Sequence, residues 1–263
     1  MSGDRKLGEK SMIIDDCNST GLPKYLIRIF NDKTYMQKFV ATGQLYMNTL
    51  EFFRNMEEGF QGDHREGKLI GKEMHSSLAI SSTNDFSNPD VVFQDVEWLI
   101  NGYIYCFFAA EENDIMISKG KLYFNQATPL NLKEAILQYK KEKKGQDIHI
   151  ILLDAQKTIQ EIEKQLGTTG FQGYQGRVKY VDNAFISSQH ILEIMSGQPW
   201  NSAFIKPQQY QYQKEWRVFI DVKPLADHAE IYLQDMKKLV VGYFNIPSSQ
   251  ELESFSSSSQ NVY

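Results

Sequence analysis

The segment at residues 103–108, Tyr-Ile-Tyr-Cys-Phe-Phe, constrains the fold most, because it is apolar on both faces of an extended chain. A strand of this composition is typical of the middle of a sheet. Residues 148–153, Ile-His-Ile-Ile-Leu-Leu, have the same central character. His149 is the polar exception there, and we expect it to be a hydrogen-bonded histidine of the core. The chain therefore predicts a sheet built around these two strands.

Shorter segments predict the elements around them. Residues 25–30 predict a strand that carries Arg28, followed by a helix with Asn31 or Asp32 as its N-cap and Gly43 as its left-handed stop. The apolar face of this helix is expected to contain Tyr35, Met36, Phe39 and Val40. Further strands are predicted at 44–47, 74–80, 177–181 and 215–221 and twice within 230–244, and further helices at 48–53, 131–145, 155–166 and 187–195.

The chain shows no sign of a second domain. No change of composition divides residues 23–247, and no internal repeat is present. We expect one α+β domain there, between a flexible N-terminal segment at 1–22 and a disordered tail at 248–263. Glycines at 167, 170, 173 and 176 predict a loop, and a phosphate cradle is disfavoured because no Gly-Lys-Ser/Thr follows them.

Composition limits the partners of this domain. The net charge of −5 argues against tight non-specific binding of nucleic acid, although a local basic patch remains open. No run of about twenty apolar residues and no apolar signal segment occur, so we expect a cytoplasmic protein that does not enter a membrane. The two cysteines, Cys17 and Cys106, form neither a Cys-x-x-Cys pair nor a disulfide framework.

Several enzyme classes lack their motifs in this chain. There is no Gly-x-Ser-x-Gly, no His-Glu-x-x-His, no Walker loop and no Gly-x-Gly-x-x-Gly after a strand. Asp63, His64 and Glu66 lie close together in sequence, but such a segment is more often a salt-bridged turn than a metal site. We therefore expect no metal centre.

The stretch at 206–221 is the strongest candidate for chemistry. A polar, Gln- and Tyr-rich loop at 208–214 leads into a strand that begins at Glu215, and a rigid strand end is where catalytic carboxylates are often held. Gln213 and Glu215 are two residues apart, so an extended chain would place them on one face. The alternative is a surface loop in which Glu215 is paired with Arg217.

The order of polar residues along the chain resembles the ADP-ribosyltransferase fold. Arg28 lies in the first strand, Ser82 and Thr83 follow a later one, and Glu215 begins a late strand. Residues 26–30 and 39–45 resemble the first strand, helix and turn of the DarT-like branch, which modifies nucleic acid. Gln213-x-Glu215 is similar to the Gln/Glu-x-Glu of other branches. The resemblance implies a single domain with a mixed, split central sheet flanked by short helices.

This resemblance also implies roles for individual residues. Glu215 would be the catalytic carboxylate that stabilises the positive charge on ribose, and Gln213 would orient the acceptor. Arg28 would hold the NAD co-substrate by its pyrophosphate or adenylate side. Ser82 and Thr83 are implied in NAD binding as the middle element, with Ser187 and Ser188 and the strand from Tyr105 to Phe107 as rivals. Tyr105 or Phe107 would stack on nicotinamide, although aromatic residues of a central strand more often belong to the core. Residues expected to bind the substrate are Arg54 and Arg65, in a functional loop from 54 to 71, and Lys214.

A second resemblance is to an uncharacterised bacterial family with a Glu-Trp-Arg strand, here at 215–217, and an Arg-Val-x-Tyr strand, here at 177–180. The Tyr-x-Cys-Phe strand of that family corresponds less closely to residues 103–107. The family implies a toxin or anti-phage defence role. The leading hypothesis is thus an NAD-dependent ADP-ribosyltransferase acting on RNA or DNA, with a possible antitoxin or chaperone partner. The alternatives are an NAD glycohydrolase and a non-catalytic binding module of the same fold.

Overall fold

The computed structural model describes residues 12–14, 21–56, 68–76, 91–118, 121–124, 136–137, 139–141, 145–182 and 197–248; for 12–14, 68–76, 91–99, 121 and 124 it gives the backbone alone. The strands are β1 (Met12–Ile14), β2 (Tyr25–Phe30), β3 (Gln44–Thr49), β4 (Lys68–Ser76), β5 (Val91–Leu99), β6 (Tyr103–Ala110), β7 (Ile115–Ser118), β8 (Lys121–Phe124), β9 (Ile148–Asp154), β10 (Gln172–Arg177), β11 (Lys179–Val181), β12 (Ile205–Pro207), β13 (Glu215–Asp221), β14 (His228–Tyr232) and β15 (Val240–Ile246). The helices are α1 (Lys33–Thr42), α2 (Leu50–Asn55), α4 (Ala155–Thr168) and α6 (Met236–Leu239), with 3₁₀ helices η1 (Pro199–Phe204) and η2 (Gln208–Gln213).

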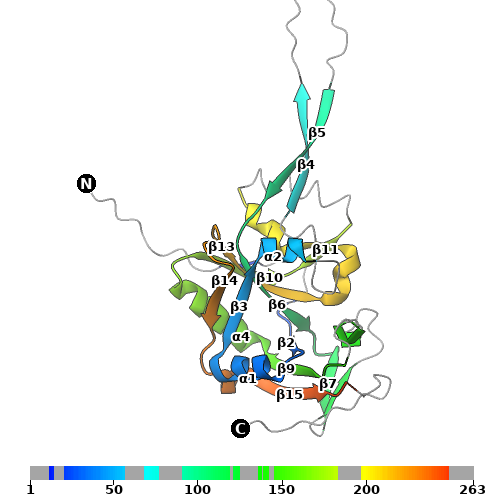
Figure 1. Cartoon of the computed structure of the whole chain (residues 1–263), viewed down its shortest axis with the longest axis vertical. Helices are drawn as coiled ribbons and strands as arrows, with labels where there is room; N and C mark the ends of the chain where they lie inside the picture. Colours follow the sequence, from blue (N-terminus) through cyan, green and yellow to red (C-terminus); the bar gives the residue numbers. More distant parts are fainter. Residues whose placement is uncertain are drawn as a thin grey trace, which may run out of the picture.

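A nine-stranded sheet organises the described part of the chain (Figure 1). Its main path is β1-β10-β13-β6-β2-β9-β15, and β3 and β14 form a branch from β6. All pairs are antiparallel except β1 with β10, so the sheet is mixed but mostly antiparallel. The predicted α+β class is confirmed, and the two segments predicted to be central, now β6 and β9, both lie inside the sheet.

The sheet divides along one edge of β6. On the opposite edge β13 pairs with β6 from Tyr103 to Phe108. On the divided edge β3 pairs with Tyr103 and Ile104, while β2 pairs only from Phe108 onward. Residues 105–107 of β6 thus have no strand partner on that edge among the described pairings. The gap begins where the pairing of β2 with β6 ends at Ile27, next to Arg28.

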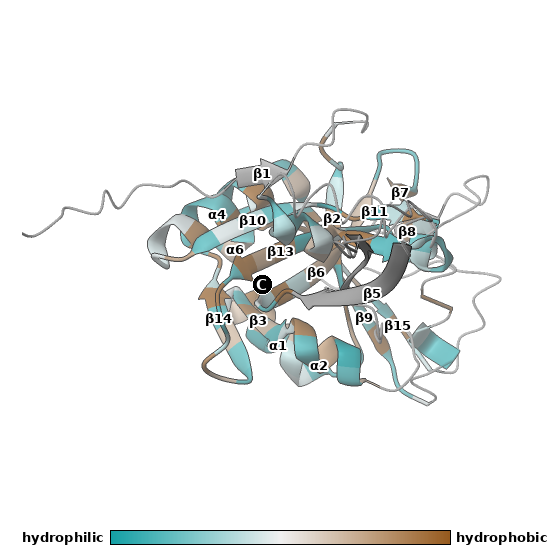
Figure 2. Ribbon diagram, turned by 90° about the horizontal axis from the view of Figure 1, so that it is seen from above, coloured by the Kyte–Doolittle hydropathy of each residue, from teal (hydrophilic) through white to brown (hydrophobic). Residues whose placement is uncertain are grey.

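Hydrophobic clusters cover both faces of the sheet. On one face Met36 and Phe39 of α1, Ile159 and Ile162 of α4 and Leu239 of α6 pack on the strands. The other face carries two smaller clusters around Phe244 and Phe219. Figure 2 shows the corresponding pattern, with hydrophobic colour along β6 and β13 and hydrophilic stretches on α4. The central strands are therefore buried on both faces, as their apolar composition on both faces predicts.

The local signals around α1 behave largely as predicted. Asp32 is the N-cap, its side chain accepting a hydrogen bond from the Thr34 amide, and Gly43 ends the helix at φ 68°. A Cβ at Gly43 would lie 2.0 Å from the Leu233 carbonyl oxygen, so the close approach of the backbone just after β14 also requires glycine. The prediction for Tyr35 was wrong, because its side chain is 67% exposed. His149 is buried and hydrogen-bonded to Tyr243 (2.8 Å), as expected.

Two predicted loops are regular structure instead. The glycine-rich stretch continues α4 through Gly167 to Thr168 and then forms β10, where Gly173 lies against Leu166 of the helix. A Cβ at Gly173 would approach the Leu166 side chain to 2.8 Å, so this glycine lets the helix pack closely on the strand. The polar stretch 208–213 is the 3₁₀ helix η2.

The strand predicted at 74–80 lies earlier in the chain, as β4, and forms an antiparallel ribbon with β5. This ribbon extends away from the main sheet in Figure 1. The predicted helix at 187–195, most of the segment 1–22 and nearly all of the tail 248–263 lie outside the described residues.

Candidate functional site

A pocket of about 820 Å³, measured out to its open mouth, lies at the gap in the sheet. Residues of β2 and β3, the two strands on either side of the gap, line the pocket together with residues of β13, the strand that carries the candidate carboxylate Glu215. The lining residues come from β2, β3, β6, β12, β13, α2, η2 and the segment 139–141. Those with polar groups are Arg28, Tyr46, Asn48, Tyr105, Cys106, Tyr139, Lys206, Gln213, Glu215 and Arg217. The lining combines apolar side chains with a few polar and charged ones, as sites for small molecules and cofactors do.

Glu215 lies between two buried cations. Its Oε1 accepts a hydrogen bond from Lys206 Nζ (2.7 Å), and its Oε2 accepts one from Arg217 Nε (2.6 Å). Burial by itself raises the pKa of this carboxyl, but Arg217 and Lys206 outweigh burial and lower the pKa from 4.5 to about 2. Glu215 is therefore ionised at neutral pH.

The polypeptide holds this carboxylate from several sides. Arg217 is fully buried and donates from Nη1 to the Ala203 carbonyl of η1, and the Glu215 amide donates to the Tyr180 hydroxyl (2.9 Å). Tyr180 stands opposite Lys206 in the small parallel sheet formed by β11 and β12. The carboxylate is thus anchored through its main chain and its side chain, and a rigid supporting shell is what a functional group requires.

Gln213 joins the same cluster, but not through an extended chain. It ends η2, and Lys214 follows in the left-handed conformation at φ 40° and ψ 54°. The Gln213 Oε1 accepts a hydrogen bond from Lys206 Nζ (2.8 Å). Gln213 and Glu215 therefore do lie close together, as expected. They do so because a turn at Lys214 and their common contact with Lys206 bring them together, not because they alternate along one strand.

Arg28 reaches the pocket from β2. Its Nη1 donates to the Cys106 carbonyl (3.1 Å), on the edge of β6 that no strand pairs with. Its guanidinium carbon lies 4.6 Å from the centre of the Tyr105 ring. Its Nε is buried without a hydrogen-bond partner among the described residues. A buried, unpaired donor in a pocket is favourable for an anionic ligand, because ligand binding would satisfy it.

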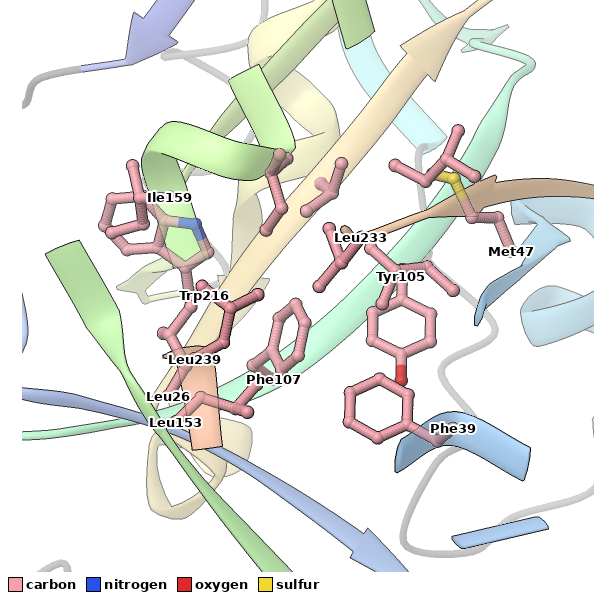
Figure 3. Packing of buried hydrophobic residues seen from close by; sticks show 14 of the residues in the cluster. Leu26, Phe39, Met47, Tyr105, Phe107, Leu153, Ile159, Trp216, Leu233 and Leu239 are labelled. Atoms are coloured by element: carbon pink, nitrogen blue, oxygen red, sulfur yellow. The ribbon is translucent and has the colours of Figure 1, made fainter. Parts of the chain in front are cut away.

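Tyr105 and Phe107 point mainly into the core. Both belong to the large cluster under α1 and α4, with exposures of 5% and 1%, and their rings contact each other edge to face at 4.9 Å. Figure 3 shows the Tyr105 ring directed toward Phe39, and Phe107 among Trp216, Leu153 and Leu239. The Tyr105 ring also packs against the Arg28 guanidinium, so Tyr105 supports the site by holding Arg28 in place.

Two of the three proposed substrate-binding residues, Arg54 and Lys214, are not among the residues that line this pocket. Arg54 is buried on α2, with Nη1 3.5 Å from the Ile100 carbonyl, and Lys214 binds both oxygens of the buried Asp114 at 3.0 Å. These contacts favour structural roles for the two residues. Arg65, Ser82 and Thr83 lie outside the described residues, as do Ser187 and Ser188 and the triplet Asp63, His64 and Glu66.

Sequence reasoning did not assign Lys206, Tyr180 or Arg217 to the site. Lys206 and Arg217 flank the recognised Gln213–Glu215 stretch, yet the sequence does not show that both side chains bind the Glu215 carboxylate. Tyr180 lies in the Arg-Val-x-Tyr strand that the sequence singled out, but its contact with Glu215 depends on tertiary structure. The alternative of a surface ion pair was correct about the partner, because Glu215 pairs with Arg217. It was wrong about the surface, because Glu215 is buried.

Comparison of the chain with known protein families found no match, and comparisons with characterised proteins and with solved structures found none either. Within the described residues, no helix is long and apolar enough to cross a membrane. The same residues contain no group of three or more His, Cys, Asp or Glu side chains arranged to hold a metal ion.

The charge of the site indicates the ligands that it can accommodate. Its described lining contains Arg28, Lys206 and Arg217 against the single carboxylate of Glu215. Cations in excess of carboxylates, held in a low-dielectric pocket, favour a ligand that carries negative charge. Among the apolar lining residues, Phe53 and Phe108 are partly exposed and provide surface for a ring, whereas Ile27 and Ile104 are buried.

Proposed function

We propose that the protein is an NAD-dependent ADP-ribosyltransferase. One observation carries this proposal: Arg28 of β2 and Glu215 of β13 line a single pocket at a gap in a mixed sheet. The chemistry needs both groups together, because one molecule of NAD presents a diphosphate and a reacting ribose at the same time.

Three features of the pocket support NAD as the proposed ligand. The guanidinium of Arg28, with its buried unpaired Nε, suits a phosphate oxygen, since arginine binds phosphate through a planar fork of donors. The apolar lining suits the nicotinamide or adenine ring. The ionised carboxylate of Glu215 suits a sugar that develops positive charge.

The reaction transfers ADP-ribose with a balanced exchange of bonds. The bond between C1′ of ribose and the nicotinamide nitrogen breaks, and its electron pair leaves with nicotinamide. Positive charge develops on the ribose, and the Glu215 carboxylate stabilises that charge. A nucleophilic atom of the acceptor then bonds to C1′ and releases its proton to water, with Gln213 orienting the acceptor. Water in the acceptor position would give the glycohydrolase reaction instead.

The acceptor in this proposal is RNA or DNA, and the biological role is that of a cytoplasmic bacterial toxin or anti-phage effector. Support for this part comes from the resemblance of residues 26–30 and 39–45 to the DarT-like branch. An antitoxin or chaperone that restrains the enzyme belongs to the same proposal. Since Arg54 and Lys214 are occupied elsewhere, the acceptor must be recognised by other residues.

One observation favours the alternative of a non-catalytic binding module. Both carboxylate oxygens of Glu215 already accept hydrogen bonds from cations. A carboxylate whose charge is balanced in this way stabilises a neighbouring positive charge less than an unpaired one does. The pocket would then bind an NAD-like ligand without cleaving it.

Incubation of the protein with NAD and measurement of free nicotinamide tests the proposal. Release that disappears in Glu215→Gln supports catalysis, and ³²P-labelled NAD with RNA, DNA or lysate protein identifies the acceptor. Release without labelling of any acceptor would favour the glycohydrolase. Binding of NAD by calorimetry without release, under every acceptor condition, would reject the enzyme and favour the binding module.

A further inference from the structure

Lys206 connects the two polar residues of the Gln213-x-Glu215 motif. Its ammonium group donates to Gln213 Oε1 at 2.8 Å and to Glu215 Oε1 at 2.7 Å. The side chain is 3% exposed, so both hydrogen bonds are shielded from water. A buried ammonium group is costly unless it is paired, and this cost keeps Lys206 on its two acceptors.

The backbone around Lys206 fixes the position of its ammonium group. Lys206 lies in β12 opposite Tyr180 of β11, and the Tyr180 hydroxyl accepts the amide proton of Glu215. The ammonium nitrogen also lies 5.3 Å from the centre of the Tyr210 ring of η2. The short β11–β12 sheet therefore supports the start of β13 through two side chains, one contacting the Glu215 main chain and the other its carboxylate.

We propose that Lys206 is the positioning residue of this site, which holds the Gln213 amide and the Glu215 carboxylate in fixed orientation toward the pocket. The inference rests on the proposed NAD cleavage for its catalytic meaning. Because Gln213 Oε1 faces Lys206, the Nε2 end of its amide is turned away from the lysine. Lys206 thus determines which end of Gln213 a substrate meets and which oxygen of Glu215 is engaged.

The charged and titratable groups around the carboxylate give this role a pH signature. Glu215 is faced by Lys206 of β12, Arg217 of β13 and Tyr180 of β11, with Cys106 of β6 also lining the pocket. Loss of one of the two cations raises the pKa of Glu215, because burial then opposes ionisation with less compensation. Among variants at position 206, the acid limb of kcat/KM should move to higher pH only in those that lose the positive charge.

The test compares Lys206→Met, Lys206→Gln and Lys206→Arg, with Lys157→Met on the exposed side of α4 as the control for loss of a lysine. For Lys206→Met we expect kcat of nicotinamide release to fall about 10- to 100-fold with KM changed less than about threefold, since misplacement of a reacting group costs rate of this order. The acid limb should move up in Lys206→Met and Lys206→Gln and stay near the wild-type position in Lys206→Arg. Lys157→Met should behave as the wild type.

A folded Lys206→Met with wild-type kcat and an unmoved acid limb would overturn the inference, even where Glu215→Gln is inactive. If Lys206→Met does not fold, Lys206→Gln decides by the same criteria. If the wild type releases no nicotinamide, the proposed function fails separately. The positioning role is then tested by ¹⁵N NMR alone. The measured quantity is the side-chain amide signal of Gln213, which is identified by its loss in Gln213→Glu. It should shift in Lys206→Met and not in Lys157→Met, and an unshifted signal would refute the positioning role.

Discussion

Arg28 and Glu215 line one pocket from opposite edges of β6, the strand that separates β2 from β13 in the sheet. β2 pairs with β6 only as far as Ile27, so Arg28 lies where the edge of β6 becomes free to accept its Nη1 hydrogen bond. Glu215 begins β13 opposite Phe108, beside the same gap. The two residues converge because the sheet divides there.

Replacement of Glu215 by Gln should remove activity and lower stability together. We expect nicotinamide release to fall about 100-fold or more, because the amide lacks the charge that stabilises the ribose cation. The free energy of unfolding should fall by about 3 kcal/mol, since Lys206 and Arg217 remain buried without their shared carboxylate. Single-turnover assays and urea unfolding measure the two effects.

The double variant Glu215→Gln, Lys206→Met is the control for this stability effect. It removes one of the two uncompensated cations, so it should recover part of the stability lost in Glu215→Gln while remaining inactive. Additive losses in the two single variants would show that Lys206 and Glu215 do not interact in solution.

Acid should weaken the fold through Glu215. Its pKa is about 2 in the folded protein and 4.5 for the ordinary carboxyl, so the unfolded state takes up the proton first as the pH falls. The stabilisation is complete above about pH 5 and disappears as the pH falls toward 2; the difference corresponds to about 3 kcal/mol. Urea unfolding of the wild type and Glu215→Gln at several pH values should show the two stabilities converging in acid. A constant difference would contradict the low pKa.

Arg28 variants should separate binding from catalysis. Arg28→Ala removes the guanidinium fork, and we expect KM for NAD to rise by at least about 30-fold, equivalent to about 2 kcal/mol. Arg28→Lys keeps the charge but not the planar donors, so it should recover only a minor part of the affinity. A fall in thermal stability with unchanged KM would mean that Arg28 only closes the gap beside Cys106.

The central strands and α1 were predictable because their signals are local. The apolar runs at 103–108 and 148–153 can be buried only inside a sheet, and Asp32 and Gly43 satisfy the ends of α1 with their own side chain and backbone. Tyr35 was mispredicted because an aromatic residue fits helical periodicity whether or not a partner covers it. β10 was missed because Gly173 serves packing against Leu166 of α4, which local sequence does not record.

Part of the candidate site was predictable because its signals are also local in the sequence. Glu215 stands out at the start of an alternating strand, and Arg28 as the charge in an apolar one. Lys206 and Tyr180 meet Glu215 through β11 and β12, a parallel pair that only the tertiary fold brings together. The ion pair of Lys214 was not predictable, because its partner, Asp114, lies in the turn after β6, far away in sequence.

Lys214 offers a test of the turn that places Gln213 beside Glu215. It has φ 40°, a conformation that costs a residue with a side chain about 1 kcal/mol relative to glycine. Its ammonium group binds Asp114, and its carbonyl accepts the Ala109 amide at 2.7 Å, which fixes the turn to the end of β6. Both Lys214→Ala and Lys214→Gly lose the ion pair with Asp114, but only glycine removes the strain of the left-handed backbone conformation.

We therefore expect both variants to be less stable than the wild type, and Lys214→Gly to be more stable than Lys214→Ala by about 1 kcal/mol in urea unfolding. Adding Asp114→Asn should partly restore stability in either background, because the carboxylate left unpaired by loss of the lysine is nearly inaccessible to solvent. KM for NAD should change little in Lys214→Gly, since Lys214 lines a separate small cavity with Asp114 and Tyr212. A large rise in KM together with normal stability would instead restore Lys214 to the substrate-binding role predicted from the sequence.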